Sequence, residues 1–420
     1  MEFEIVNKES IRPSSPTPPE LRHLYLSFFD ASVPCQYLQC VFFYHNNNQC
    51  SADSRRRSHS EVLKHSLSEV LTHYYPFAGR LIDGASVECN NVGATFTEAN
   101  LQCPMSDVTK SDEIWKLLCP EDGTEINPIL SVQLTRFQCG GEAICVFLSH
   151  KLSDVITFAT FMNDWASIAR SPGALLPVSP QFNAASFFPP GRKPFPLVRE
   201  QRVDNTVVKR FVFEGSKITA LKVMVSEKVE NPTRIELLSA LIYKAVVISA
   251  GGFEKRPPPP SSLLQVVNIR KRVVPPLPEA LKGNIITFYV VPLQEEVELW
   301  EVVRDMKRNF EEFCDKYPQN YEAAEWISLH KLFMEESFGR MAQNFYTCSS
   351  WCNVGLYEVD FGCGKPAWIT MPDIVRKNSI VLMDLKHELE GMEALVCLDK
   401  DVMAAFERNE ELLCFGCLKS

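Results

Sequence analysis

The stretch AICVFLSHKLSDVITFATFMNDW, which runs from Ala143 to Trp165, decides the expected fold around one histidine. Its apolar start, Ala143–Leu148, predicts a fully buried strand that pairs with a strand at Leu130–Phe137 through a tight glycine turn. The run Val155–Trp165 has helical spacing. His150 therefore falls at a strand-to-helix corner, where its backbone is held and its imidazole can face a cavity.

His150 and Asp154 form an HxxxD pattern. A histidine is the natural general base at neutral pH, because its pKa lies close to the working value. The pattern alone also fits a half-buried histidine near a helix N-terminus, with Asp154 as a first-turn carboxylate favoured by the helix dipole. Ser149 is not expected to act as a nucleophile, because adjacent strand residues face opposite sides.

A second motif, Asp360-Phe361-Gly362-Cys363-Gly364-Lys365-Pro366, lies far downstream. Two glycines that bracket one residue indicate a turn with unusual backbone dihedral angles or a close approach of the backbone. Taken alone, this motif predicts a structural loop without chemistry.

Together the two motifs resemble those of the BAHD family of plant CoA-dependent acyltransferases, which carry HxxxD in mid-chain and DFGWG near the C-terminus. The similarity covers essentially the whole chain and is greatest to the branch of vinorine synthase, deacetylvindoline acetyltransferase and salutaridinol acetyltransferase, which acetylate alkaloid alcohols. Further matching stretches are Ile11–Pro18, Tyr75–Leu81, Gln265–Arg270 and Gly283-Asn284.

The resemblance implies an α/β fold with two similarly folded, chloramphenicol acetyltransferase-like domains. Each would be a mixed β-sheet flanked by helices, with a solvent channel between the two. We expect an N-terminal domain at 1–190, a connector at 191–205 and a C-terminal domain at 206–420. The segment at about 360–385 would cross back to the N-terminal domain, and the DFGWG-like motif would lie at the edge of the C-terminal one.

The resemblance also implies a mechanism without a covalent acyl-enzyme. His150 would take the proton of the acceptor hydroxyl and return a proton to the departing CoA thiolate. Asp154 would pair with Arg270 and fix the geometry of the site. Asp360, Gly362 and Gly364 would support the site structurally. Asn284 is a candidate oxyanion or channel residue, although a turn-stabilising role fits it equally well.

The leading hypothesis is an acyltransferase of specialised metabolism that moves an acetyl group from acetyl-CoA to an alkaloid hydroxyl. Acyl-CoA would be a co-substrate, with no bound cofactor. The match departs from the family at Cys363, which replaces the tryptophan of DFGWG, and at Asn353, where relatives usually have arginine. The alternative is therefore a catalytically altered or repurposed member that binds a ligand or uses a different acyl donor. A hydrolase with a Cys/His pair is a third hypothesis, but no cysteine has a recognisable nucleophile context.

Composition limits the other classes. The 420 residues suit two domains, and the net charge of -9 argues against a nucleic-acid partner. No apolar run of about 20 residues predicts a membrane span, and the N-terminus does not resemble a signal peptide. Fifteen cysteines without a repeated spacing suggest free thiols in a reducing compartment. The single CxxC at Cys414–Cys417 makes a poor zinc site. We expect a cytoplasmic monomer without a metal.

Overall fold

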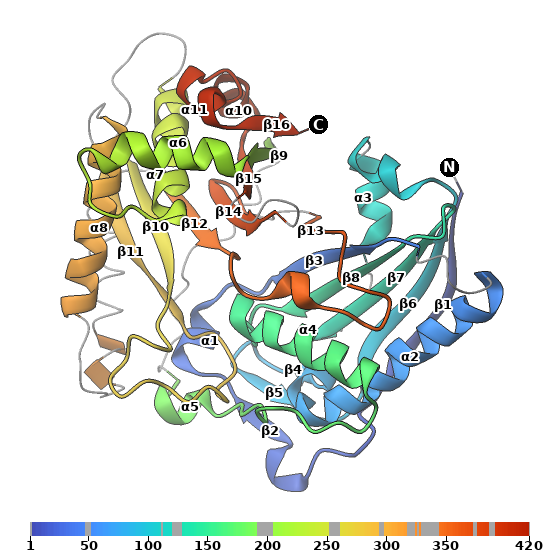
Figure 1. The fold of residues 1–420 in the computed structure, drawn as a ribbon. Coiled ribbons are helices and arrows are strands. Elements are labelled where there is room, and N and C mark those ends of the chain that lie inside the picture. The colour runs from blue at the N-terminus through green and yellow to red at the C-terminus, as the bar shows by residue number, and fades with distance from the viewer. Residues whose placement is uncertain are drawn as a thin grey trace. The chain divides into compact units, whose positions relative to one another are not determined.

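The computed structural model divides into two compact units (Figure 1). The first unit comprises Met1–Val198, Pro278–Ile285 and Val354–Pro372, and the second comprises Arg199–Leu277, Ile286–Asn353 and Asp373–Ser420. The structure describes residues 2–46, 52–110, 112–119, 128–190, 205–251, 261–293, 298–316, 324–325, 327–328, 344–372, 376–385 and 391–419.

The first unit is built on a mixed sheet with the strand order β1-β6-β7-β8-β3-β13. β6 and β7 run parallel, whereas the other neighbouring strands are antiparallel. The predicted hairpin is confirmed, since β7 and β8 pair and are buried along almost their whole length. The strands are β1 (Phe3–Ile11), β3 (Tyr37–Tyr44), β6 (Ala94–Leu101), β7 (Leu130–Phe137), β8 (Glu142–Ser149) and β13 (Trp368–Thr370).

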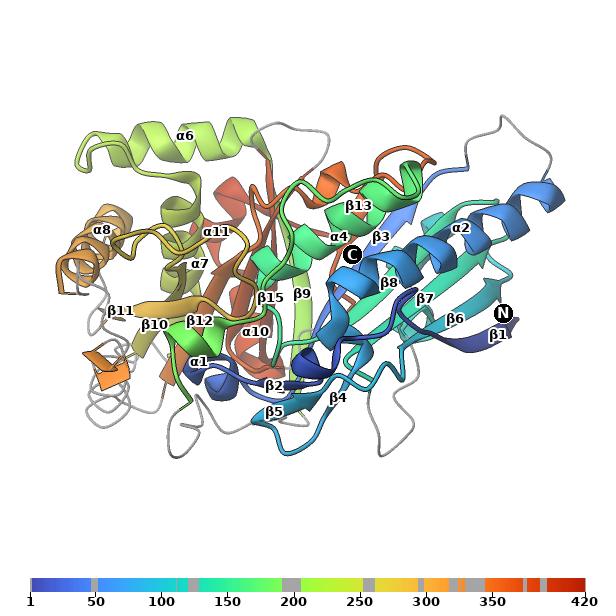
Figure 2. The same ribbon diagram turned by 90° about the horizontal axis from the view of Figure 1, so that it is seen from below.

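Two long helices, α2 (Ala52–His73) and α4 (Val155–Arg170), lie side by side along this sheet (Figures 1 and 2). Leu63 and Leu67 of α2 are completely buried. Smaller elements complete the unit: η1 (Pro19–Leu21), α1 (Phe28–Ser32), η2 (Tyr75–Ala78), η3 (Met105–Lys110), α3 (Asp112–Leu118), α5 (Ala184–Phe187), η4 (Leu356–Glu358), and a small sheet of β2 (His23–Tyr25), β5 (Ser86–Glu88) and β4 (Arg80–Leu81).

The second unit has its own mixed sheet, in the order β11-β10-β12-β14-β15-β9-β16. A capping box begins α7, where Thr233 accepts from the Glu236 backbone N–H and Glu236 accepts from that of Thr233. The elements are β9 (Thr206–Phe213), α6 (Gly215–Ser226), α7 (Arg234–Ala250), β10 (Ser261–Asn268), β11 (Ile286–Leu293), α8 (Leu299–Lys316), β12 (Asn344–Ser350), β14 (Ser379–Asp384), β15 (Met392–Asp399), α10 (Lys400–Phe406), α11 (Glu410–Phe415) and β16 (Cys417–Lys419).

The expected α/β class with two sheet-containing domains is confirmed. The segment at about 360–385 was expected to lie wholly with the first domain, but its C-terminal end belongs to the second sheet. β13 joins the first sheet beside β3, but β14 pairs with β12 and β15 in the second sheet. The short stretch Pro278–Ile285 also belongs to the first unit and was not expected there. Residues 191–204 of the proposed connector lie outside the described residues, so that boundary stays a prediction.

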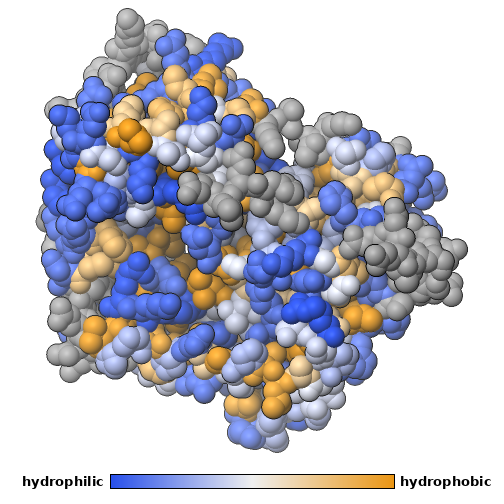
Figure 3. Space-filling view, in the orientation of Figure 1, coloured by the Kyte–Doolittle hydropathy of each residue, from blue (hydrophilic) through white to orange (hydrophobic). Residues whose placement is uncertain are grey.

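The surface is a mosaic of hydrophilic residues and small hydrophobic groups on the face shown in Figure 3. Within the described ranges, no helix combines the length and the apolar character that a membrane crossing requires. The fourteen cysteines that the structure describes are all free thiols, including Cys414 on α11 and Cys417 on β16.

Candidate active site

His150 lies immediately after β8, in the turn that leads to α4. Its backbone is fixed, because its N–H donates to the Gln36 carbonyl at 2.8 Å and the Leu152 N–H donates to Ser149 at 3.1 Å. The histidine is half-buried. The strand-to-helix corner predicted from the sequence is therefore present, and it holds the histidine on rigid elements.

The pKa of His150 lies below its usual value. Burial is the main cause, because it disfavours the charged imidazolium. Backbone groups of His150 and Ser153, the charge of Asp154 and the amide of Asn284 act in the opposite direction without overcoming it. The imidazole is thus neutral near pH 7 and has a lone pair with which to accept a proton.

Asp154 is the N-cap of α4 and is almost completely buried. Its Oδ1 accepts from the Thr157 N–H at 2.9 Å, and its Oδ2 accepts from the Ile285 N–H at 3.0 Å. The carboxylate therefore caps the helix and ties it to the Pro278–Ile285 segment. These contacts favour a structural role for Asp154.

Gly283 is a fixed point of this segment. It exchanges two hydrogen bonds with Thr157, whose Oγ1 donates to the Gly283 carbonyl at 3.0 Å and accepts from the Gly283 N–H at 3.1 Å. Its φ of +124° is disfavoured for residues with a side chain, and an added Cβ would lie 3.1 Å from Asp30 Oδ1. Glycine is thus required at this position.

Asn284 is completely buried beside the histidine. Its Nδ2 donates to the His150 carbonyl at 2.6 Å and to Asp30 Oδ1 at 3.0 Å, and its backbone N–H donates to the same Asp30 oxygen at 2.7 Å. Because both hydrogens of the amide nitrogen are occupied, neither is available to an oxyanion. The geometry favours the turn-stabilising alternative over the oxyanion role.

Arg270 follows β10 in the second unit. Its backbone N–H and its guanidinium donate to Asn268 Oδ1 at 3.1 and 3.3 Å. Asp154 belongs to the first unit. The pairing of Arg270 with Asp154 therefore stays a prediction.

The Asp360–Gly364 motif forms a self-capped turn in the first unit. Asp360 Oδ1 accepts from the N–H groups of Gly362 at 2.8 Å and Gly364 at 2.9 Å, and both glycines have φ near +95°. The ring of Phe361 packs edge-on against Trp165 of α4 with 4.7 Å between centroids. The segment thus lies beside α4 (Figure 1), and these contacts match the structural-loop interpretation.

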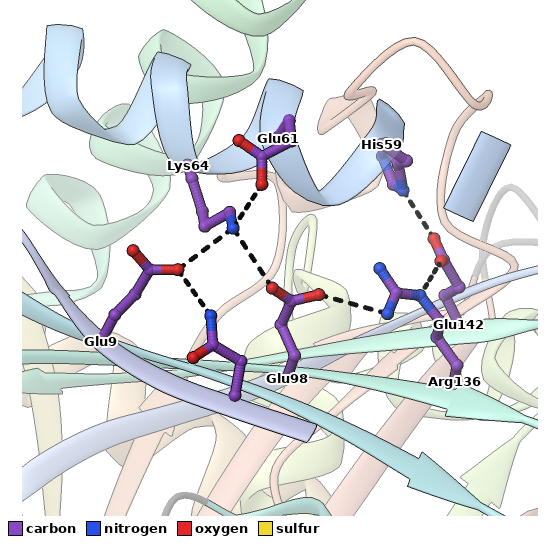
Figure 4. Close-up of polar contacts among 8 residues, drawn as sticks. Glu9, His59, Glu61, Lys64, Glu98, Arg136 and Glu142 are labelled. Atoms are coloured by element: carbon purple, nitrogen blue, oxygen red, sulfur yellow. Dashed lines mark hydrogen bonds and ion pairs between the residues drawn. The ribbon is translucent and has the colours of Figure 1, made fainter. Parts of the chain in front are cut away.

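Cys363, at the tip of this turn, interacts electrostatically with the side chain of His59. Figure 4 shows His59 reaching from α2 toward Glu142, with 2.6 Å between Nδ1 and Oε2, and Arg136 bridging Glu142 and Glu98. Burial alone would lower the pKa of His59, but the interactions with Cys363 and Glu142 raise it to about 10. Sequence reasoning missed this cluster, because its members are far apart in the chain and match no motif.

Asn353 lies in the second unit with a left-handed φ of +58°. Its backbone N–H donates to Asp384 Oδ2 at 2.7 Å, and Asp384 also lies 3.9 Å from the Arg234 guanidinium. An asparagine suits this backbone, because it tolerates the left-handed region better than an arginine does.

A family model described as "Transferase family" matches residues 1–413. Akuammiline synthase 1 of Alstonia scholaris is 36% identical over 99% of this chain and 98% of its own length. Stemmadenine O-acetyltransferase of Catharanthus roseus is 32% identical, with 96% of each chain covered. The crystal structure of vinorine synthase is 32% identical, covers 96% of each chain and superposes with a TM-score of 0.83.

The chain therefore belongs to the BAHD family of acyltransferases and is an enzyme of that class. Members of this family use an acyl-CoA as co-substrate and a small molecule as acceptor.

Proposed function

We propose that the protein transfers an acetyl group from acetyl-CoA to a hydroxyl of an alkaloid, with His150 as general base. The imidazole at the corner after β8 carries this proposal, because burial lowers its pKa and favours the uncharged form, and its backbone is held by hydrogen bonds. The names of two relatives support the reaction and the substrate class, since one is an akuammiline synthase and the other a stemmadenine O-acetyltransferase.

In the proposed reaction, His150 accepts the hydroxyl proton while the acceptor oxygen attacks the thioester carbonyl. The C–S bond then breaks, and the imidazolium returns a proton to the CoA sulfur. General-base assistance of this kind contributes roughly 10²–10⁴-fold to the rate. Asp154 caps α4 and does not take part in the proton transfer. The proposal includes a cytoplasmic monomer, and the net charge of -9 is consistent with the absence of a nucleic-acid partner.

The alternative is a member with altered or lost donor handling. It rests on Cys363 in place of the tryptophan of the family motif and on Asn353 in place of an arginine. The retention of His150, Asp154 and Arg270 together favours the active enzyme, because a decayed site would be expected to lose the histidine first.

The test is the release of free CoA thiol by the purified protein with acetyl-CoA and a panel of hydroxylated alkaloids and terpenoids. Release that depends on one acceptor class supports the proposal, and mass spectrometry of the product then separates O- from N-acetylation. Binding of CoA without release would favour another donor or acceptor. Absence of both would favour the repurposed member.

A further inference from the structure

Asp30 is a buried carboxylate that the proposed mechanism does not use. It lies in α1, more than one hundred residues before His150 in the sequence, and is 4% exposed. Its Oδ2 accepts from the Ser27 N–H at 3.1 Å and from the Ser27 hydroxyl at 2.6 Å. Its Oδ1 accepts both hydrogen bonds from Asn284. Both oxygens are therefore committed to donors on opposite sides.

The contacts of Asn284 leave only one orientation for its amide. Asp30 Oδ1 and the His150 carbonyl are both pure acceptors, so the NH₂ group must face them. The carbonyl oxygen Oδ1 of Asn284 then lies on the other side of the amide. That oxygen is buried and has no hydrogen-bond partner among the described residues.

A second buried polar atom without such a partner lies in the same place. It is Nδ1 of His150, the residue whose carbonyl accepts from Asn284 Nδ2 at 2.6 Å and whose imidazole interacts electrostatically with the Asn284 amide. A buried polar atom left alone costs free energy, so two complementary ones at one site are expected to pair. If Asn284 Oδ1 accepts the hydrogen of Nδ1, the lone pair lies on Nε2.

We propose that Asp30 is a positioning residue of the reaction, because its carboxylate orients the side-chain amide of Asn284. The Nδ2 of Asn284 donates to the His150 carbonyl, and the Oδ1 of Asn284 accepts from the protonated Nδ1 of the His150 ring. Nε2 of His150 is then the basic nitrogen. This inference rests on the proposed role of His150 as base. It is independent of the identity of the acceptor.

The decisive variant is Asp30→Asn. The two oxygens of Asp30 accept from Asn284 and from Ser27, but an asparagine side chain has only one oxygen. Its NH₂ group would therefore face a donor of either Asn284 or Ser27. We expect kcat to fall about 10–100-fold, a part of the ~10²–10⁴-fold that a general base contributes. The KM values for acetyl-CoA and acceptor are expected to stay within about threefold, because no contact that binds them uniformly is removed.

The pH profile gives a readout that a purely structural role would not change. The imidazole is surrounded by its own backbone, the Ser153 backbone, the Asp154 carboxylate and the Asn284 amide, and these raise its pKa against the effect of burial. Lys151, which neighbours His150, donates its Nζ hydrogen to the Ala31 carbonyl. Loss of the oriented amide removes support for the imidazolium, so the acid limb of kcat/KM should move to lower pH.

The experiment compares Asp30→Asn, Asn284→Ala, the double variant and Asp164→Asn. Asp164 is a matched control, because it is another buried carboxylate of the first unit but bonds the Tyr74 hydroxyl at 2.7 Å. We expect the two single variants to share the loss of kcat and the pH shift, and the double variant to be no worse than Asn284→Ala. Additive losses, or an unchanged kcat and pH profile in folded Asp30→Asn, would overturn the inference.

If Asp30→Asn does not fold, Asn284→Ala decides alone, since a wild-type kcat in that variant is incompatible with the inference. His150→Ala is measured in parallel. Full activity of His150→Ala would refute the proposed function itself. An inactive His150→Ala beside a fully active Asp30→Asn would refute only the positioning role.

Discussion

At the scale of single residues, the candidate site is defined by the hydrogen bonds of His150 and Asp154 at the turn between β8 and α4. His150 has its backbone bound and its ring kept neutral by burial. Asp154 has its two oxygens bound by backbone N–H groups of Thr157 and Ile285. The HxxxD motif thus combines a histidine with a lowered pKa and a carboxylate that stabilises the local backbone.

Asp154→Ala is predicted to destabilise the protein by roughly 2–4 kcal/mol, because it removes a helix N-cap and leaves the Ile285 N–H without its acceptor. Urea denaturation monitored by circular dichroism measures the loss. A midpoint equal to that of the wild type would contradict the structural role of Asp154.

The histidine was predictable from the sequence, whereas its supporting residues were not. His150 is found from a local pattern of strand, HxxxD and helix. Asp30 and Asn284 are 254 positions apart; Asn284 was a candidate for another role, and Asp30 belongs to no motif. Only the folded chain shows that they share a hydrogen bond, so the oxyanion hypothesis for Asn284 had no local signal against it.

At the scale of elements, local periodicity predicted the strands β7 and β8 and the helix α4. The return of Pro278–Ile285 to the first unit and the placement of β14 in the second sheet were not predicted. Both depend on pairings between distant segments, about which short-range patterns carry no information.

Gly283→Ala is predicted to destabilise the Pro278–Ile285 segment by about 1–3 kcal/mol, because alanine is strained at a φ of +124° and its Cβ would approach Asp30. Gly84→Ala is the matched control. Gly84 also has a positive φ, of +72°, but no neighbouring atom lies within 4 Å of an added Cβ. Thermal unfolding of both variants tests the difference, and equal losses would show that contact with Asp30 is unimportant.

The folded protein is predicted to lose stability as the pH rises into the alkaline range, because His59 of α2 loses its charge beside Glu142 of the sheet. The pKa of His59 is raised to about 10 in the folded protein, against 6.5 as its ordinary value. The charged imidazolium therefore stabilises the fold fully below pH 6.5, and this contribution is lost as the pH rises through about 10.

Urea denaturation between pH 6 and 10 measures this effect. The wild type should lose more stability over this range than His59→Gln, which keeps a polar side chain but cannot titrate. An identical pH dependence in both proteins would show that His59 is not charged in the folded state.

At the scale of the whole molecule, sequence similarity, the two mixed sheets and the superposition on vinorine synthase agree on the BAHD family. At the two departures from the family pattern, Cys363 interacts electrostatically with His59, and Asn353 adopts a left-handed backbone whose N–H donates to Asp384. Both replacements are therefore integrated into the fold.

The enzyme is accordingly predicted to bind CoA despite these two replacements. Isothermal titration calorimetry with CoA measures binding without requiring an acceptor. We expect a dissociation constant in the micromolar range, or about -8 kcal/mol. The absence of binding by folded protein would support the repurposed member.

The central claim is that His150 is the general base of direct acyl transfer, and the most direct measurement is kcat/KM of wild type and His150→Ala with acetyl-CoA and an accepted alcohol. We predict a loss of about 10²–10⁴-fold in the variant with an unchanged unfolding temperature. Acceptor-dependent CoA release by His150→Ala at a rate close to that of the wild type would contradict this claim.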